Sequence, residues 1–160
     1  MIIFINGSIN AGKTTIARLL AARVKNVAIV EVDSLRQMIE WMPIKDSIPL
    51  NLENAVAVIK NFSSRGLNVV VPYPLSKENY EYMVDSLRDM KVDIKVFTLA
   101  PRLSLAVANR GTRELTREEI ERIKYHYEIG IPNPSFGEII DNSDQSPDDT
   151  AEYIFKRLGF

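Results

Sequence analysis

Short runs rich in valine and isoleucine begin at intervals of 25 to 46 residues along the chain. They occupy residues 1–6, 27–32, 67–71, 92–99 and 138–141. The first three runs are almost continuously apolar, without a polar residue at every second position, which is typical of parallel strands covered on both faces. The pattern therefore predicts five strands in a buried, parallel sheet.

Between these runs, apolar residues recur every three or four positions, as on one face of a helix. The clearest case is the segment 50–64, with Leu52, Ala55, Val56, Ile59 and Phe62. The spacing predicts helices over 15–23, 33–41, 50–64, 77–91, 103–109, 116–128 and 147–158.

Two of these helices carry start signals. Thr116 precedes Glu119 by three residues, which is the spacing of a capping box. Ser146 is followed by Pro147 and two aspartates, which combine a cap, a first-turn proline and negative charge at the positive end of the helix dipole. Strands that alternate with helices predict an α/β fold of three layers around a doubly wound parallel sheet of about five strands. We find no repeat or linker and expect a single domain over residues 1–160.

The strongest chemical signal is the sequence Gly-Ser-Ile-Asn-Ala-Gly-Lys-Thr at residues 7–14. It lies between a predicted strand and a predicted helix, which is the context of a phosphate-binding P-loop. Glycines let backbone N–H groups point at phosphate oxygens, and the helix directs its positive end there. We expect Lys13 to bridge the β- and γ-phosphates of ATP and the Thr14 hydroxyl to hold Mg²⁺. The expected nucleotide-binding residues are Gly7, Ser8, Asn10, Ala11, Gly12, Lys13, Thr14 and Thr15.

A second candidate group follows the second predicted strand. Glu31 and Asp33 are two residues apart, so on an extended chain they face the same side, and Arg36 follows one helical turn later. A carboxylate beside the P-loop can accept the proton of an attacking hydroxyl, which makes Asp33 the candidate base. Arg36 can hold an anionic or hydroxylated part of the acceptor. The alternative for Asp33 is a purely structural role as a helix cap.

The third group is a set of arginines in the segment 109–117. A lid that moves Arg110 and Arg113 over the phosphates would neutralise charge in the transition state and exclude water. We therefore expect both arginines to be catalytic, ahead of Arg117. A solvated surface loop, balanced by neighbouring glutamates, is the alternative.

The third predicted strand ends in Val-Pro-Tyr-Pro at residues 71–74, without the acidic residue that many P-loop proteins carry there. Magnesium would then depend on Thr14, phosphate oxygens and water, with Asp33 or Glu31 acting through water. Tyr73 is a candidate for the wall of the acceptor pocket, although a rigid turn explains the prolines equally well. Trp41 could cover the acceptor or pack in the core. We expect the single histidine, His126, to be structural rather than catalytic.

These features resemble the small P-loop kinases of the shikimate kinase and nucleotide kinase group over nearly the whole chain. The resemblance implies a P-loop NTP hydrolase fold with strand order 2-3-1-4-5. It also implies an acceptor-binding aspartate after the second strand, an arginine lid, and a loop at 143–146 that packs on adenine.

Two narrower resemblances concern the acceptor. Residues 1–13, 32–35 and 42–45 resemble chloramphenicol phosphotransferase. The pattern Asp33-x-x-Arg36-Gln37, together with Val96-Phe97 and Arg-Gly-Thr at 110–112, resembles the kinase domain of phage polynucleotide kinase. In both families, the aspartate that matches Asp33 acts as a base toward the acceptor hydroxyl.

Composition narrows the range of partners. The net charge is −1, with 20 basic and 21 acidic residues, which disfavours nucleic acid as a partner without excluding a short local groove. There is no cysteine, so disulfides and thiolate metal sites are excluded. No apolar run approaches the roughly 18 residues of a membrane span, and no signal-peptide pattern is present. We expect a cytoplasmic protein that is a monomer or a weak dimer and has no membrane partner.

The residues together predict a phosphotransferase that uses ATP and Mg²⁺ and moves the γ-phosphate to a hydroxyl of a small-molecule acceptor, with Asp33 as base. A polynucleotide 5′-hydroxyl kinase, or a nucleoside or nucleotide kinase, is the first alternative. A non-catalytic nucleotide-binding module is the second.

Overall fold

A computed structural model describes residues 1–109 and 113–159. In this part of the chain, parallel strands form one sheet in the order β2-β3-β1-β4-β5. The strands are β1 (Ile2–Gly7), β2 (Val27–Ile29), β3 (Asn68–Pro72), β4 (Ile94–Leu99) and β5 (Glu138–Ile140). The predicted α/β class, the parallel sheet and the strand order 2-3-1-4-5 are confirmed.

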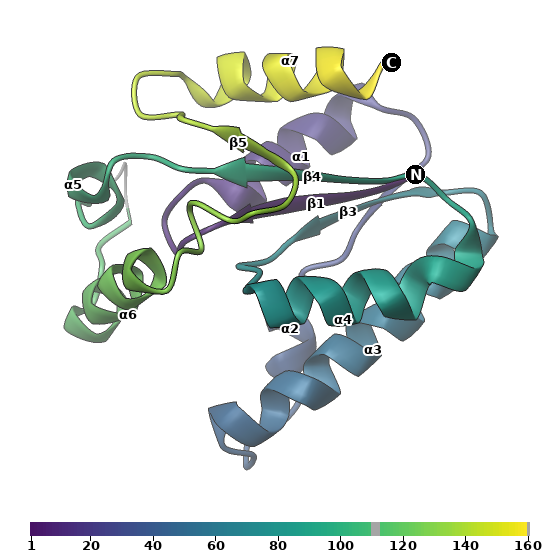
Figure 1. Ribbon diagram of the computed structural model, residues 1–160, viewed down its shortest axis with the longest axis horizontal. Coiled ribbons are helices and arrows are strands. Elements are labelled where there is room, and N and C mark those ends of the chain that lie inside the picture. Colours follow the sequence, from purple (N-terminus) through teal and green to yellow (C-terminus); the bar gives the residue numbers. More distant parts are fainter. Residues whose placement is uncertain (110–112, 160) are drawn as a thin grey trace.

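Helices cover both faces of the sheet (Figure 1). On one face lie α1 (Lys13–Arg23) and α7 (Pro147–Leu158), which pack against each other. On the other lie α3 (Ile44–Ser64) and α4 (Lys77–Leu87), which also pack against each other. The remaining helical segments are α2 (Val32–Arg36), η1 (Arg88–Met90), α5 (Leu103–Ala106) and α6 (Arg117–Glu128).

The central strand β1 shows why an apolar run becomes a buried strand. Ile2 and Phe4 belong to the hydrophobic cluster beneath α3 and α4, whereas Ile3 and Ile5 belong to the cluster beneath α1 and α7. Successive side chains of a strand point to opposite faces, so both faces of β1 need apolar residues. All four side chains are almost completely buried.

The two predicted helix starts are confirmed. The Thr116 hydroxyl accepts a hydrogen bond from the Glu119 N–H at 3.1 Å, and the Glu119 carboxylate accepts one from the Thr116 N–H at 2.9 Å. Ser146 and Asp149 form the same reciprocal pair at the start of α7. These bonds satisfy N–H groups that have no partner inside the helix.

Several predicted boundaries are wrong. The strand expected over 27–32 ends at Ile29, and α2 ends at Arg36 rather than at residue 41. Helix α3 begins at Ile44, six residues before the predicted start, and continues through Pro49. Proline removes one hydrogen bond to the carbonyl four residues earlier, but here that carbonyl belongs to the exposed Lys45, where water can replace the lost partner.

Among the residues that the structure describes, no helix has the length and apolar character needed to cross a membrane.

Candidate active site

The loop between β1 and α1 has a backbone that only glycine adopts freely. Gly7 and Gly12 have φ angles of 137° and 100°. A Cβ atom on Gly7 would lie 2.6 Å from the carbonyl oxygen of Leu99, so a side chain has neither a suitable conformation nor space. Gly12 precedes α1 without a side-chain cap, which leaves N–H groups of the first helical turn available to an anion.

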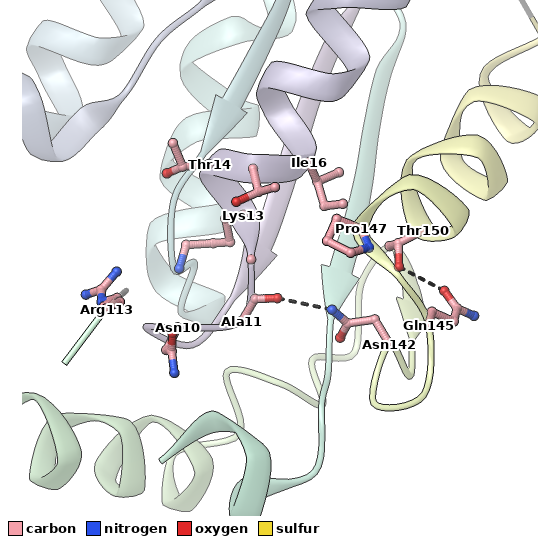
Figure 2. A pocket seen from close by; sticks show the side chains of 12 residues that line it. Asn10, Ala11, Lys13, Thr14, Ile16, Arg113, Asn142, Gln145, Pro147 and Thr150 are labelled. Atoms are coloured by element: carbon pink, nitrogen blue, oxygen red, sulfur yellow. Dashed lines mark hydrogen bonds between the residues drawn. The ribbon is translucent and has the colours of Figure 1, made fainter. Parts of the chain in front are cut away.

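A cavity of about 430 Å³ opens beside this loop (Figure 2). One wall consists of the loop and the first turn of α1, from Asn10 to Ile16. The other wall comes from the segment after β5 and the start of α7. The lining residues on that side are Asn142, Gln145, Pro147 and Thr150. We refer to this space as the nucleotide cavity.

Two asparagines hold the loop in place. The Asn10 amide donates to the carbonyl oxygens of Ala106 and Ala108, each at 2.9 Å. The Asn142 amide donates to the Ala11 carbonyl oxygen at 3.1 Å, while its own side-chain oxygen is buried without a hydrogen bond. A buried acceptor without a partner is costly, so a ligand with a hydrogen-bond donor would stabilise this wall.

Most of the predicted nucleotide-binding residues line the cavity. These are Asn10, Ala11, Gly12, Lys13, Thr14 and Thr15. Gly7 and Ser8 do not, because they form the base of the loop at the end of β1. From the loop expected to contact adenine, residues 143–146, only Gln145 reaches the cavity, where the Thr150 hydroxyl donates to its side-chain oxygen.

The Lys13 ammonium group occupies the concave side of the loop. It donates a hydrogen bond to the Ser8 carbonyl oxygen at 2.7 Å. Burial lowers the pKa of Lys13 to about 8, the charge of Asp33 opposes that shift, and the charge of Arg113 adds to it. Burial lowers the pKa because it removes the charged ammonium group from water. A bound polyphosphate would return the pKa toward its usual value.

A second cavity of about 380 Å³ lies beyond the P-loop. It brings together the three predicted acceptor-binding residues, Asp33 and Arg36 from α2 and Tyr73 from the segment after β3. The rest of the lining comes mainly from α3, α6 and the segment after α6. Its apolar part is formed by Ile9, Ile44, Ile48, Pro74, Ile129 and Ile131. We refer to this space as the acceptor cavity.

The Tyr73 hydroxyl is kept protonated in this cavity. Burial raises its pKa to about 12, and the charge of Asp33 acts in the same direction, whereas Arg122 and Arg36 oppose it. Tyr73 is therefore available as a neutral hydrogen-bond donor at physiological pH.

The sequence-based interpretation missed the position of His126. This side chain is buried, lines the acceptor cavity, and lies with its Nδ1 atom 3.3 Å from the Ser8 hydroxyl of the P-loop. Burial lowers its pKa to about 4, and the charges of Lys13 and Arg122 add to that shift, so the ring is neutral at pH 7. The available signal was the spacing of residues 119, 122 and 126, which places three cavity-lining residues on one face of α6.

Of the arginines expected in a lid, Arg113 lines the nucleotide cavity and pairs with Glu119 at 2.7 Å. Arg110 lies outside the described residues, as do the other two residues of the Arg-Gly-Thr motif. Arg117, the weaker candidate, lines neither cavity.

Glu31 does not accompany Asp33. It pairs with Arg18 at 3.6 Å and lines a separate surface hollow, with Ser34. The expectation that Glu31 and Asp33 face the same side is wrong because β2 ends at Ile29, and α2 has begun by the time the chain reaches Asp33. Trp41 is 81% exposed, so it is not part of the core.

Within residues 1–109 and 113–159, no three acidic or histidine side chains gather into a metal-binding group. Thr14, the metal ligand expected from the P-loop, lines the nucleotide cavity.

Comparisons with known proteins agree with this architecture. A family model described as "Chloramphenicol phosphotransferase-like protein" matches residues 1–159. No curated protein is significantly similar in sequence.

Solved structures with the same fold include several from other organisms. A tunicamycin resistance protein from Deinococcus radiodurans has a TM-score of 0.71 at 20% identity, with 99% of this chain and 95% of that chain covered. The Mycobacterium tuberculosis APS kinase CysC, in complex with AMPPNP and APS, has a TM-score of 0.65 at 16% identity, with 99% and 97% covered. Kti12 from Chaetomium thermophilum, in complex with ADP-AlF3, has a TM-score of 0.67 at 14% identity, with 99% and 97% covered. The chain thus has a kinase-like P-loop nucleotide-binding fold.

Proposed function

This chain belongs to the chloramphenicol phosphotransferase-like family, and we propose that it transfers the γ-phosphate of ATP to a hydroxyl group of a small-molecule acceptor. The observation that carries the proposal is that the P-loop borders both cavities. Residues 10–15 of the loop and of the first turn of α1, Lys13 among them, line the nucleotide cavity, whereas the preceding Ile9 lines the acceptor cavity together with Asp33. A phosphate on the loop would therefore lie close to an acceptor beside Asp33.

The nucleotide cavity supplies the groups that bind the polyphosphate. The loop N–H groups and the start of α1 favour anionic oxygens, and Lys13 neutralises the β- and γ-phosphates. Thr14 is the proposed ligand of Mg²⁺, which would neutralise phosphate charge. The buried, unpartnered oxygen of Asn142 fits a donor on the bound nucleotide. The residues present are thus compatible with ATP and Mg²⁺.

The acceptor cavity supplies the base and the residues that orient the acceptor. Asp33 is exposed to the cavity and accepts the proton of the attacking hydroxyl. Arg36 and the neutral Tyr73 hydroxyl hold polar groups of the same molecule. Arg113, at the rim of the nucleotide cavity, exchanges its pairing with Glu119 for the charge that develops on the transferred phosphate.

We favour a small acceptor over a polynucleotide. The acceptor cavity, at about 380 Å³, falls within the range of about 300–1,000 Å³ that is usual for small-molecule sites. The near-neutral net charge offers no general attraction to a nucleic-acid backbone.

The proposal is tested by incubating the protein with ATP, Mg²⁺ and one compound at a time from a panel of hydroxylated molecules. The panel includes nucleosides, sugars, shikimate, aminocyclitols, phenicols and 5′-hydroxyl oligonucleotides, and ADP and phosphorylated product are measured by mass spectrometry. We expect one small-molecule class to stimulate ADP formation and to yield one phosphorylated product per ADP. Lys13→Ala should abolish both signals.

A protein that binds ATP but phosphorylates none of these classes would be a nucleotide-binding module, and the proposal would be wrong. Phosphorylation confined to the oligonucleotides would replace the small acceptor with a polynucleotide.

A further inference from the structure

Two arginines that line the acceptor cavity have no acidic partner in the part of the chain that the structure describes. Arg36 and Arg122 both line the cavity, and neither takes part in an ion pair among the described residues. By contrast, the nearby Arg113 is bound to Glu119. A guanidinium group at a cavity wall without a counter-ion is a ready partner for an anionic ligand, because carboxylate and phosphate oxygens match its donors.

The two arginines reach the cavity from different helices. Arg36 lies one turn after Asp33 on α2, and Arg122 lies on α6 between Glu119 and His126. Both residues line the same cavity as Tyr73, and both charges lower the pKa of its hydroxyl against the effect of burial.

The acidic side chains of the cavity do not neutralise this pair. Glu119 accepts hydrogen bonds from the Thr116 N–H and from Arg113, and these hold the pKa of its carboxyl below the usual value. Asp33 is the remaining carboxylate in the lining, and it is the proposed base. The described lining therefore carries two uncommitted positive charges and one uncommitted negative charge, an excess that a singly charged acceptor would balance.

An independent observation also points to a polar ligand. Asn51 of α3 lines the cavity, is 2% exposed, and has a side-chain oxygen that is buried without a hydrogen bond. Such an oxygen needs a donor, which a ligand hydroxyl or N–H group would supply. The isoleucines on the same wall suit the apolar body of that ligand.

We infer that the acceptor is an anionic hydroxylated small molecule, whose carboxylate or phosphate group binds between Arg36 and Arg122 while its hydroxyl faces Asp33. The inference rests on the proposed phosphotransferase function and deepens it by naming the substrate class. Arg122, which the sequence did not single out, becomes a specificity-determining residue.

The first test compares pairs of acceptors that differ in one anionic group. Suitable pairs are a nucleoside and its 5′-monophosphate, a sugar and its 6-phosphate, and shikimate methyl ester and shikimate. We expect kcat/KM to favour the anionic member of the pair that is used by at least about tenfold, the equivalent of roughly 1.4 kcal/mol. In Arg122→Gln and in Arg36→Gln this preference should fall to about equal use.

Arg65→Gln is the matched control, because Arg65 is exposed and lines neither cavity. It should keep the preference of the unmodified protein. Arg122→Lys, which retains the charge but not the planar donor pair, should keep part of it.

The second test uses inorganic sulfate and needs no knowledge of the acceptor. With the nucleotide cavity saturated by a non-hydrolysable ATP analogue and Mg²⁺, sulfate is titrated while the arginine Nε–Hε signals are followed by NMR. We expect the Arg36 and Arg122 signals to shift together and to saturate, and the Arg65 signal to stay in place. Arg122→Gln should weaken sulfate binding several-fold.

The outcomes distinguish the proposed anion site from the proposed phosphotransferase function. Sulfate binding that depends on Arg122, in a protein that transfers phosphate to no acceptor, would support the anion site and reject the phosphotransferase. Transfer that favours the neutral member of every pair would overturn the inference while the phosphotransferase stands. Absence of any sulfate effect on Arg36 and Arg122 would overturn it as well.

Discussion

The nucleotide cavity and the acceptor cavity are built in different ways. The phosphate-binding wall of the nucleotide cavity comes from one contiguous stretch, and its shape depends on backbone conformation at Gly7 and Gly12. The acceptor cavity is assembled from side chains of α2, α3, α6 and the segments after β3 and α6. In the proposed function, the first site binds a group common to all nucleoside triphosphates, and the second determines which acceptor is chosen.

This difference has a physical basis. Backbone N–H groups are the same in every sequence, so a phosphate site made from them needs only glycines at the right positions and a helix to follow. Selection among acceptors needs side chains of particular shape and charge, and these can come from any element that reaches the same space. The P-loop joins the two sites, because Ile9 lines the acceptor cavity and the next residue, Asn10, lines the nucleotide cavity. His126 of the acceptor cavity lies 3.3 Å from the Ser8 hydroxyl of the same loop.

The largest expected effect is at Asp33, and it separates transfer from binding. Asp33→Asn keeps the size of the side chain but cannot accept a proton, so phosphoryl transfer should fall by about 10²–10⁴, the range expected for a general base. A loose transition state would place the loss at the lower end, because the hydroxyl then needs less activation. ATP affinity, measured by calorimetry on the same preparation, should change little. Full transfer activity in this variant would reduce Asp33 to a structural residue.

Arg113 should affect turnover more than binding. If it leaves Glu119 to meet the transferred phosphate, Arg113→Ala should lower kcat by about a hundredfold or more, because arginines that stabilise phosphoryl transfer contribute at least that much. The KM for ATP should change much less. Arg117→Ala, a neighbouring arginine that lines neither cavity, is the control and should keep kcat. If Arg113→Ala kept the same kcat as Arg117→Ala, Arg113 would have no role in phosphoryl transfer.

Lys13 should dominate nucleotide affinity. Lys13→Ala removes the charge that faces the phosphates but leaves the loop glycines in place, so ATP–Mg²⁺ binding should weaken at least about tenfold, or roughly 1.4 kcal/mol. Lys25→Ala, at an exposed position outside both cavities, should bind normally. Calorimetry that found the same affinity in both variants would contradict the nucleotide site.

The smallest expected effect is the change of folding stability with pH that the buried His126 ring causes. Its pKa is about 4 in the folded protein and about 6.5 when unfolded, so between these values the unfolded chain binds more protons. The contribution of the neutral ring to folding stability is fully present above pH 6.5 and is lost as the pH falls toward 4. From pH 7.5 to 5.5 the folded-to-unfolded ratio should fall about tenfold, or about 1.4 kcal/mol.

Denaturant unfolding at the two pH values measures this loss, and His126→Gln should show a smaller pH dependence. The comparison is clean because the chain has no other histidine. An equal pH dependence in the variant would mean that the ring is not held neutral beside Ser8.

The nucleotide half of the molecule was predictable because its signals are local. The P-loop, the capping box at Ser146 and the buried strands each depend on residues within a few positions of one another. The strand order followed from the resemblance that these local motifs carry.

The acceptor half was predictable only in part. Asp33, Arg36 and Tyr73 follow strands of the sheet, and the rule that ligands bind beyond the carboxyl ends of parallel strands was sufficient to select them. Arg122 and His126 come from α6, whose charged composition is typical of a helix that faces solvent. The tertiary packing places these two residues in the wall of the acceptor cavity. The predicted start of α3 was six residues too late because proline usually marks a helix boundary, and the sequence alone does not reveal that the helix continues through Pro49.

The central claim is that the two cavities are halves of one phosphotransfer site. The most direct test is a crystal structure with Mg²⁺, a non-hydrolysable ATP analogue and the acceptor identified by the panel. The account predicts an acceptor hydroxyl oxygen within about 3.5 Å of the γ-phosphorus and about 3 Å of the Asp33 carboxylate. An acceptor bound outside the cavity of Asp33 and Tyr73, or one with every hydroxyl facing away from the P-loop, would contradict it.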